Sequence, residues 1–282
     1  MARILNEKEI QQLEIAEYVL KDFGLQKIYQ IFAGLKNRVD VSIYANADYD
    51  VPQMSEIRKG LESGVNASLY ADPKYSKRQM EQIREGLEAG IDASIYASHE
   101  YSWYQMMIIR EGLEAGLDVS IYADPQFEHM KMRIILQGLE DGLDVSGYAD
   151  PKFGSHQMNE IRIGLMNGID TTVYADRKFD YNQMREIRIG LENGIDVSLY
   201  ADPKFNDWQM KIIRTGLEEV LDVSVYANAD FSAEQMIQIY LGLANGVDVS
   251  VYANSKKDPE QMEIIRKRLQ RLQANAKRNS EN

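Results

Sequence analysis

The chain reads Ile57-Arg58-Lys59-Gly60-Leu61 in its first quarter, and this phrase returns at a period of 26 residues without a slip. Clear copies begin at Ile83, Ile109, Ile161, Ile187 and Ile213, and weaker copies begin at Ile31, Ile135, Ile239 and Ile265. A constant period of this length is typical of stacked supersecondary units, none of which can bury its apolar face alone. The sequence therefore predicts one array of repeats, in which the shared residues serve stacking and only departures from the consensus can be specific to a partner.

The first half of each unit has the pattern of an amphipathic helix. In one unit, Ser102 is a suitable N-cap, and residues 103–115 follow it with apolar side chains at Met106, Ile109 and Leu113. This spacing puts the three side chains on one buried stripe. We therefore expect a long helix in every unit.

Two glycines recur in this half. Gly116 is expected to end the helix, because a glycine readily takes the left-handed conformation that a helix stop favours. Gly112 lies inside the helix, where it costs about 1 kcal/mol relative to alanine. Its counterparts are Gly60, Gly86, Gly138, Gly164, Gly190, Gly216 and Gly242. We expect that a neighbouring backbone in the stack comes too close for a Cβ atom.

The second half of the unit, residues 117–123, admits two interpretations. Its apolar residues alternate as in a strand, but Asp118 is a good N-cap and Pro125 disfavours helix at the residue before it. We favour a very short helix over residues 119–123. A tyrosine followed by alanine occurs here in all nine complete units, at Tyr44, Tyr70, Tyr96, Tyr122, Tyr148, Tyr174, Tyr200, Tyr226 and Tyr252. We expect each ring to fill the space between units and to send its hydroxyl to the rim.

The predicted fold is thus an all-α solenoid of about nine 26-residue units, each a long helix plus a very short helix, with capping helices at both ends. The alternative is a leucine-rich-repeat-like α/β horseshoe, whose usual ladder asparagine is replaced here by tyrosine. The expected organisation has an N-terminal capping helix at 1–22, nine repeats at 23–256, and a degenerate last repeat with a basic C-terminal helix and tail at 257–282.

Residues 183–205, which run from Gln183-Met184 to Lys204-Phe205, resemble a tandem helical repeat of bacterial proteins whose role is uncertain. The resemblance covers nearly the whole chain, from Phe23 to about Leu272. It implies a helical unit and carries no activity. In alternating long and very short helices, the general plan is also similar to leucine-rich-variant repeats.

The amino-acid composition excludes several classes of function. Absence of cysteine excludes disulfides, thiolate catalysis and cysteine-based zinc sites, and the N-terminal residues include no apolar run long enough for a signal peptide or membrane span, so we expect a cytoplasmic protein. The net charge is −12, with +4 on residues 255–282 and −16 on the remainder, which disfavours direct nucleic-acid binding. No catalytic motif occurs, and the three histidines fall in different units. We expect no enzyme activity, no cofactor and no metal.

One helix position is repeatedly arginine. It carries Arg58, Arg84, Arg110, Arg162, Arg188, Arg214 and Arg266. A row of cations could bind a polyanion, but a glutamate follows most of these arginines by four residues, and aspartate caps recur along the chain. We expect each arginine to pair with that glutamate or with a cap.

The candidate binding residues stand where the consensus varies. Beside the start of the long helices, the central units carry Trp103, Tyr104, His129, Met130, His156, Tyr181 and Trp208. Equivalent positions of stacked units lie side by side, and exposed tryptophan and tyrosine are typical of protein-binding hot spots. The other interpretation is that these side chains cover the rim of the core. A second departure is the run of apolar residues at Met107, Ile108, Ile134, Ile163, Ile189, Ile212, Ile237 and Leu241, which either widens the buried stripe or awaits a partner.

We therefore expect a non-enzymatic repeat scaffold that binds a protein partner through an aromatic and acidic surface on the central repeats. One alternative is an acidic mimic of nucleic acid that occupies a DNA- or RNA-binding protein. Another is a designed or purely structural repeat array. No membrane association is expected, and the sequence leaves the oligomeric state open.

Overall fold

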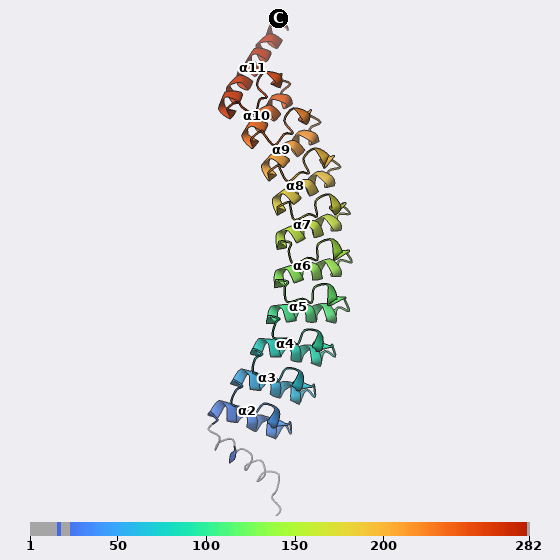
Figure 1. The fold of residues 1–282 in the computed structure, drawn as a ribbon, viewed down its shortest axis with the longest axis vertical. Coiled ribbons are helices and arrows are strands. Elements are labelled where there is room, and N and C mark those ends of the chain that lie inside the picture. Colours follow the sequence, from blue (N-terminus) through green and yellow to red (C-terminus); the bar gives the residue numbers. More distant parts are fainter. Residues whose placement is uncertain (1–15, 18–22, 281–282) are drawn as a thin grey trace, which may run out of the picture. The chain divides into compact units, whose positions relative to one another are not determined.

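The structure is a computed structural model that describes residues 16–17 and 23–280 of the chain. The capping helix predicted over residues 1–22 lies outside the described residues, apart from two of them. The fold is all-α: long helices alternate with 3-10 helices at the 26-residue spacing of the sequence, in a solenoid-like array of repeats (Figure 1). Two compact units divide the chain, Met1–Glu140 and Asp141–Asn282, here called unit 1 and unit 2.

In each of the two units, long helices alternate with 3-10 helices along the chain, and most of the long helices have twelve residues. In unit 1 these elements are α2 (Leu25–Lys36), η1 (Val41–Ile43), α3 (Val51–Glu62), η2 (Ala67–Leu69), α4 (Lys77–Glu88), η3 (Ala93–Ile95), α5 (Trp103–Glu114), η4 (Val119–Ile121) and α6 (His129–Glu140). In unit 2 they are η5 (Val145–Gly147), α7 (Ser155–Met166), η6 (Thr171–Val173), α8 (Tyr181–Glu192), η7 (Val197–Leu199), α9 (Asp207–Glu218), η8 (Val223–Val225), α10 (Ala233–Ala244), η9 (Val249–Val251) and α11 (Pro259–Ser280). Within each unit, every long helix packs on the next (Figure 1).

The long helix was predicted closely. Helix α5 begins after the N-cap Ser102 and ends before the C-cap Ala115, and Gly116 follows with a φ of +70°. Met106 and Ile109 are fully buried, as the apolar stripe requires. The predicted helix stop is confirmed, and two of the three residues predicted on the buried face are buried, whereas Leu113 is half-buried.

The short element is a helix, and the strand alternative is wrong for the described residues. Each copy is a single 3-10 turn of three residues, shorter than the predicted stretch 119–123. In η4 the side chain of Asp118 accepts a hydrogen bond from the backbone N–H of Ser120 at 3.0 Å. The element stops after three residues because Tyr122 leaves the helical conformation, with φ −130° and ψ −3°.

The repeated tyrosine does not send its hydroxyl to the rim, so that prediction is wrong. Tyr122 has no exposed surface, and its hydroxyl donates to the backbone carbonyl of Ile108, 3.3 Å away in the long helix of the same repeat. A buried hydroxyl requires such a partner, because leaving it unpaired costs about 1–3 kcal/mol. The tyrosine thus fastens the 3-10 helix to the long helix.

This contact also corrects the explanation of the internal glycine. A Cβ atom on Gly112 would lie 2.0 Å from the hydroxyl oxygen of Tyr122 and 2.9 Å from Val119 Cγ1. The close neighbours are therefore side chains of the same repeat, and not the backbone of an adjacent repeat as we expected. Glycine is needed because the tyrosine hydroxyl occupies the space of a methyl group.

A glutamine at the third position of most long helices links consecutive repeats. In α5, Gln105 Oε1 accepts from the backbone N–H of Ser102 at 2.7 Å, and Gln105 Nε2 donates to the carbonyls of Pro125 at 3.1 Å and Phe127 at 2.8 Å. One side chain therefore completes the capping box of its own helix and holds the loop that leads into the next. The sequence contains this glutamine in the recurring Gln-Met pair, but its second role depends on where the next loop lies.

The repeated arginine also joins neighbouring helices. Arg84 Nη1 lies 2.6 Å from Glu88 in its own helix, as one of the two predicted pairings requires, and Nε lies 3.0 Å from Glu56 Oε2 in the preceding helix. Most of these arginines have a polar partner 28 residues earlier, at Gln30, Glu56, Gln82, Glu160, Glu186 and Gln238. Carboxylates neutralise six of the seven arginines locally, whereas Arg266 donates to Gln238 and Gln270, so the row offers little positive charge to a polyanion.

Candidate protein-binding surface

The seven predicted binding residues lie in the first turn of long helices. Four of them are well exposed, with exposed fractions of 60% for Trp208, 55% for Met130, 43% for Tyr181 and 42% for Tyr104. His129 and His156 are also exposed, and Trp103 is half-buried. These side chains do not belong to the fully buried core, whose large members are mainly the repeated tyrosines.

In unit 1 the aromatic residues form one connected cluster across three helices. The Trp103 and Tyr104 rings stack with centroids 3.5 Å apart, and Tyr104 stacks on His129 of α6 at 5.1 Å. The guanidinium of Arg78, in α4, lies 4.6 Å from the Trp103 ring centroid. Contact with both neighbours explains why Trp103 is less exposed than Tyr104. We call these four residues the Trp103 cluster.

Unit 2 carries two further groups of candidate residues, which also lie in the first turns of its long helices. His156 of α7 and Tyr181 of α8 lie with ring centroids 5.0 Å apart. Trp208 of α9 stands separately, with Lys211 Nζ 5.3 Å from its ring centroid. Met130, in unit 1, makes no ring contact among the described residues.

Capping boxes fix the backbone beneath the candidate residues of α5, α8 and α9. At the start of α8, the Asp180 carboxylate accepts from the N–H groups of Asn182 and Gln183, and at the start of α9, the Asn206 side chain accepts from Gln209 N at 2.9 Å. Gln183 and Gln209 return a bond to the cap residue and continue to the following loop. Exposed aromatic residues thus project from well-anchored turns, which reduces the entropy lost when they bind.

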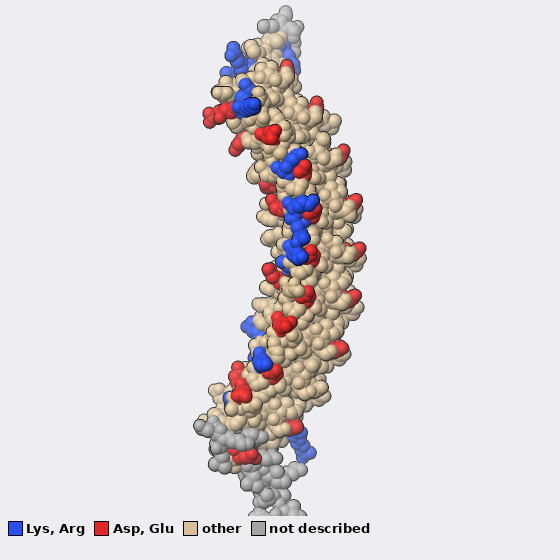
Figure 2. Space-filling view, in the orientation of Figure 1, with Lys and Arg blue, Asp and Glu red and all other residues tan. Residues whose placement is uncertain are grey.

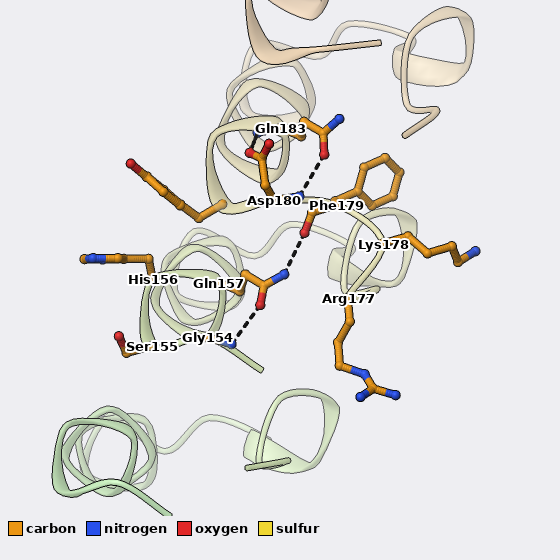
Figure 3. A pocket seen from close by; sticks show the side chains of 10 residues that line it. Gly154, Ser155, His156, Gln157, Arg177, Lys178, Phe179, Asp180 and Gln183 are labelled. Carbon is orange, nitrogen blue, oxygen red and sulfur yellow. Dashed lines mark hydrogen bonds between the residues drawn. The ribbon is translucent and has the colours of Figure 1, made fainter. Parts of the chain in front are cut away.

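A shallow pocket of about 460 Å³ lies beside the His156 and Tyr181 pair (Figure 3). Gly154 N donates to Gln157 Oε1 at 2.7 Å, and Gln157 Nε2 donates to the carbonyl of Phe179 at 2.6 Å, so the floor is internally bonded. His156 points to one side, whereas Arg177 points to the other (Figure 3). The side chains of His156 and Arg177 therefore do not converge on one point of the pocket.

The additional apolar residues of the long helices mostly widen the buried stripe. Ile108, Ile134 and Ile212 are buried, and the other five are half-buried. Part of this strip nevertheless lines an apolar groove beside Trp208, on α9 and α10. Sequence analysis named Trp208 but missed Lys211 and Tyr240; the available signal was the replacement of the repeated arginine by Tyr240.

Other kinds of site find no support in the part of the chain that the structure describes. No three histidine, aspartate or glutamate side chains there come close enough together to hold a metal ion. In the same residues, no helix is both long and apolar enough to cross a membrane. His99 stacks on Tyr75 with centroids 3.9 Å apart, in a repeat that contains neither of the other histidines.

No protein-family model, curated protein or solved structure matches this chain.

Proposed function

We propose that this chain is a non-enzymatic repeat scaffold that binds a partner protein through the aromatic residues at the starts of its central long helices. The observation that carries the proposal is the 60% exposure of Trp208, on a chain whose other repeated aromatic positions are almost completely buried. Large aromatic side chains on a rigid support are the residues that contribute most to protein interfaces. We also propose that the chain belongs with the bacterial repeat proteins that its unit resembles, which is supported by the repeat length and the helical plan.

Charge supports a protein partner over direct nucleic-acid binding. The chain carries a net charge of −12, and the arginine row is engaged by carboxylates and amides of the same protein. A phosphate backbone would gain little from such a surface.

Site-specific photocrosslinking tests the proposal. Benzoylphenylalanine would replace Tyr104, Tyr181 or Trp208 in cells that express the gene naturally, and Leu199 would be the matched control, because it is 47% exposed on η7. We expect the three aromatic positions to crosslink to one partner and the control to give none. Equal crosslinking at Leu199 would contradict the proposal.

Affinity for the purified partner then provides the quantitative test. Trp208→Ala should weaken binding by about 2 kcal/mol, or roughly 30-fold, which is the loss expected for an interface hot spot. Leu199→Ala should leave the affinity unchanged. Circular dichroism of both variants must match the wild type, because neither side chain belongs to the core.

A regular row of carboxylates favours one second candidate, an acidic mimic of nucleic acid. Hydrogen bonds from the following serine or threonine hydroxyl and N–H hold the pKa of the 3-10 caps below its usual range at Asp118, Asp144, Asp170 and Asp248. Acidic residues recur along one edge of each unit (Figure 2). Mimicry predicts a basic partner whose binding falls steeply with salt, whereas an aromatic interface should change little between about 0.1 M and 0.5 M salt.

A further inference from the structure

An apolar groove of about 160 Å³ opens beside Trp208 on unit 2. Its walls are Trp208, Lys211 and Ile212 of α9 and Ile237, Tyr240 and Leu241 of α10. We call it the Trp208 groove. Since one water molecule occupies about 30 Å³ of liquid, the groove holds about five waters, which one bulky aliphatic or aromatic side chain could displace.

The groove exists because the arginine link is missing between α9 and α10. Tyr240 occupies the arginine position, and Ile212 occupies the position of its polar partner 28 residues earlier. Tyr240 instead donates its hydroxyl to Glu219 Oε1 at 2.7 Å, which holds the ring at the side of the groove. Two linked departures from the consensus therefore replace an ionic contact with apolar walls.

Unit 1 contains the same replacement, but an ion pair accompanies it. There the corresponding pair is Ile108 and Leu136, but an ion pair between Glu111 of α5 and Arg133 of α6 spans the equivalent place. In unit 2 the residues at those two repeat positions are Thr215 and Ile237, and both line the groove. The open groove thus depends on four departures from the arginine-linked contact.

Two cations border the groove. Lys211 lies over the Trp208 ring, and a polar hollow on the other side of Trp208 is lined by Arg185 and Lys211 together with Asn182, Glu186 and Asp207. Neither cation forms an ion pair within the residues that the structure describes. Of the nearby acids, Glu186 is held by Arg214 at 2.9 Å and Glu219 accepts from Tyr240, whereas the Asp207 side chain lines the same hollow as the two cations. Figure 2 shows lysine and arginine gathered over α7–α9, on a protein that is acidic as a whole.

We propose that the Trp208 groove binds an acidic segment of a partner protein, which places one bulky apolar side chain between α9 and α10 and its carboxylates on Arg185 and Lys211. This inference rests on the proposed function and makes it specific. The net negative charge of the chain would favour a basic partner. At the Trp208 groove the preference is for an acidic segment, because the cations at this place, and not the distant acidic caps, face the bound segment.

Three labelled peptides of about twelve residues test the inference. They share a central Leu-Met pair and differ in their flanks, which are aspartate and glutamate, serine and glutamine, or lysine. Fluorescence anisotropy with the full chain should show roughly tenfold tighter binding of the acidic peptide than of the neutral one, and the weakest binding for the basic one. Salt should weaken the acidic complex most.

Two variants of the full chain locate the binding. Lys211→Glu should favour the basic peptide over the acidic one. The double variant Thr215→Glu/Ile237→Arg installs the ion pair that spans the equivalent place in unit 1, and it should abolish binding of every peptide. Leu199→Ala is the control that should change nothing.

Three results would overturn the inference: equal or tighter binding of the basic peptide, binding that survives closure of the groove, or no binding of any peptide at about 1 mM. None of them would decide the proposed function, because crosslinking at Tyr104 and Tyr181 measures partner binding outside the Trp208 groove. Conversely, failure of crosslinking at Tyr104 and Tyr181, together with crosslinking at Trp208 and tight binding of the acidic peptide, would confine the function to the groove.

Discussion

The contact between the internal glycine and the repeated tyrosine predicts an unusual response to mutation. Alanine is normally more favourable than glycine inside a helix, by about 1 kcal/mol. In Gly86→Ala, however, the new Cβ atom would lie 1.9 Å from the hydroxyl oxygen of Tyr96. Tyr96 is completely buried, and its hydroxyl donates to the carbonyl of Gln82 at 3.1 Å. We therefore expect Gly86→Ala to destabilise the protein.

The magnitude follows from what the ring must do. The hydroxyl oxygen has to move from 1.9 Å to the 3.4 Å of an ordinary contact. Overpacking of a buried site costs about 1–3 kcal/mol, and loss of the hydroxyl's hydrogen bond costs about 1–3 kcal/mol more. After subtraction of the helix propensity gained by alanine, the free energy of unfolding should fall by about 1–5 kcal/mol.

Removal of the hydroxyl should partly rescue this variant. Tyr96→Phe alone costs about 1 kcal/mol, since the Gln82 carbonyl keeps its helical hydrogen bond. In the double variant Gly86→Ala/Tyr96→Phe, the closest ring atom is Cζ at 3.2 Å, and it needs to move by only a few tenths of an ångström. The double variant should be more stable than Gly86→Ala, with a coupling energy of about 1–3 kcal/mol.

Urea unfolding of the four proteins, followed by circular dichroism, measures this cycle. Gly90→Ala is the matched control, because Gly90 has a φ of +77° and a Cβ atom added there would meet no atom within 4 Å. It should cost about 1–2 kcal/mol through its left-handed backbone, and Tyr96→Phe should not rescue it. If Tyr96→Phe lowers the stability of Gly86→Ala by as much as it lowers that of the wild type, the hydroxyl is not the reason for glycine.

Three other perturbations test separate contacts. Glu56 is 1% exposed; burial disfavours its ionisation, but hydrogen bonds from Lys59 and Arg84 prevail and hold its pKa below the usual range. In urea melts at pH 7, Glu56→Gln should therefore cost under about 1 kcal/mol and Glu56→Ile about 2 kcal/mol, because only glutamine still accepts from Arg84; equal losses would contradict this. Gln105→Glu keeps the capping box but loses the Nε2 donor, so hydrogen exchange in the loop that holds Phe127 should be faster than in the wild type while the start of α5 stays protected. Gln105→Met loses both contacts and should speed up exchange in both places. Equal protection of the loop in Gln105→Glu and the wild type would refute the link between the repeats. Burial raises the pKa of Tyr148 and Tyr252 to about 12, so their contribution to the free energy of unfolding is complete below pH 10 and declines as the pH rises from 10 towards 12. In a pH titration, the loss of helical circular dichroism and the rise of tyrosinate absorbance at about 295 nm should therefore occur together. Tyrosine ionisation that precedes unfolding would contradict this prediction.

Much of the local structure could be predicted from single repeats. Ser102, the apolar stripe of Met106 and Ile109, and the stop at Gly116 each express a preference that acts within a few residues. The Asp118 cap likewise identified the short helix. Such features can be predicted from one repeat because the interacting residues lie in the same repeat, close together in sequence.

Contacts with partners farther along the chain were predicted wrongly for the tyrosine and were not predicted for the glutamine or for the second partner of the arginine. The Tyr122 hydroxyl reaches a carbonyl 14 residues earlier, Gln105 reaches a carbonyl 22 residues later, and Arg84 reaches a carboxylate 28 residues earlier. Pattern analysis shows that these residues recur but not which atoms they meet. The positions at 212 and 240 became informative only when that spacing was known.

The sequence by itself determined that the protein is an array of 26-residue helical units, because period, caps and apolar stripe are local and repeat without interruption. It also identified the aromatic residues that vary among the central units. Only the tertiary structure decided which of them stand free, that the arginines are neutralised, and that a groove opens beside Trp208. These properties depend on side chains from different repeats meeting in space, and the distance between two repeats is set by packing and not by any residue alone.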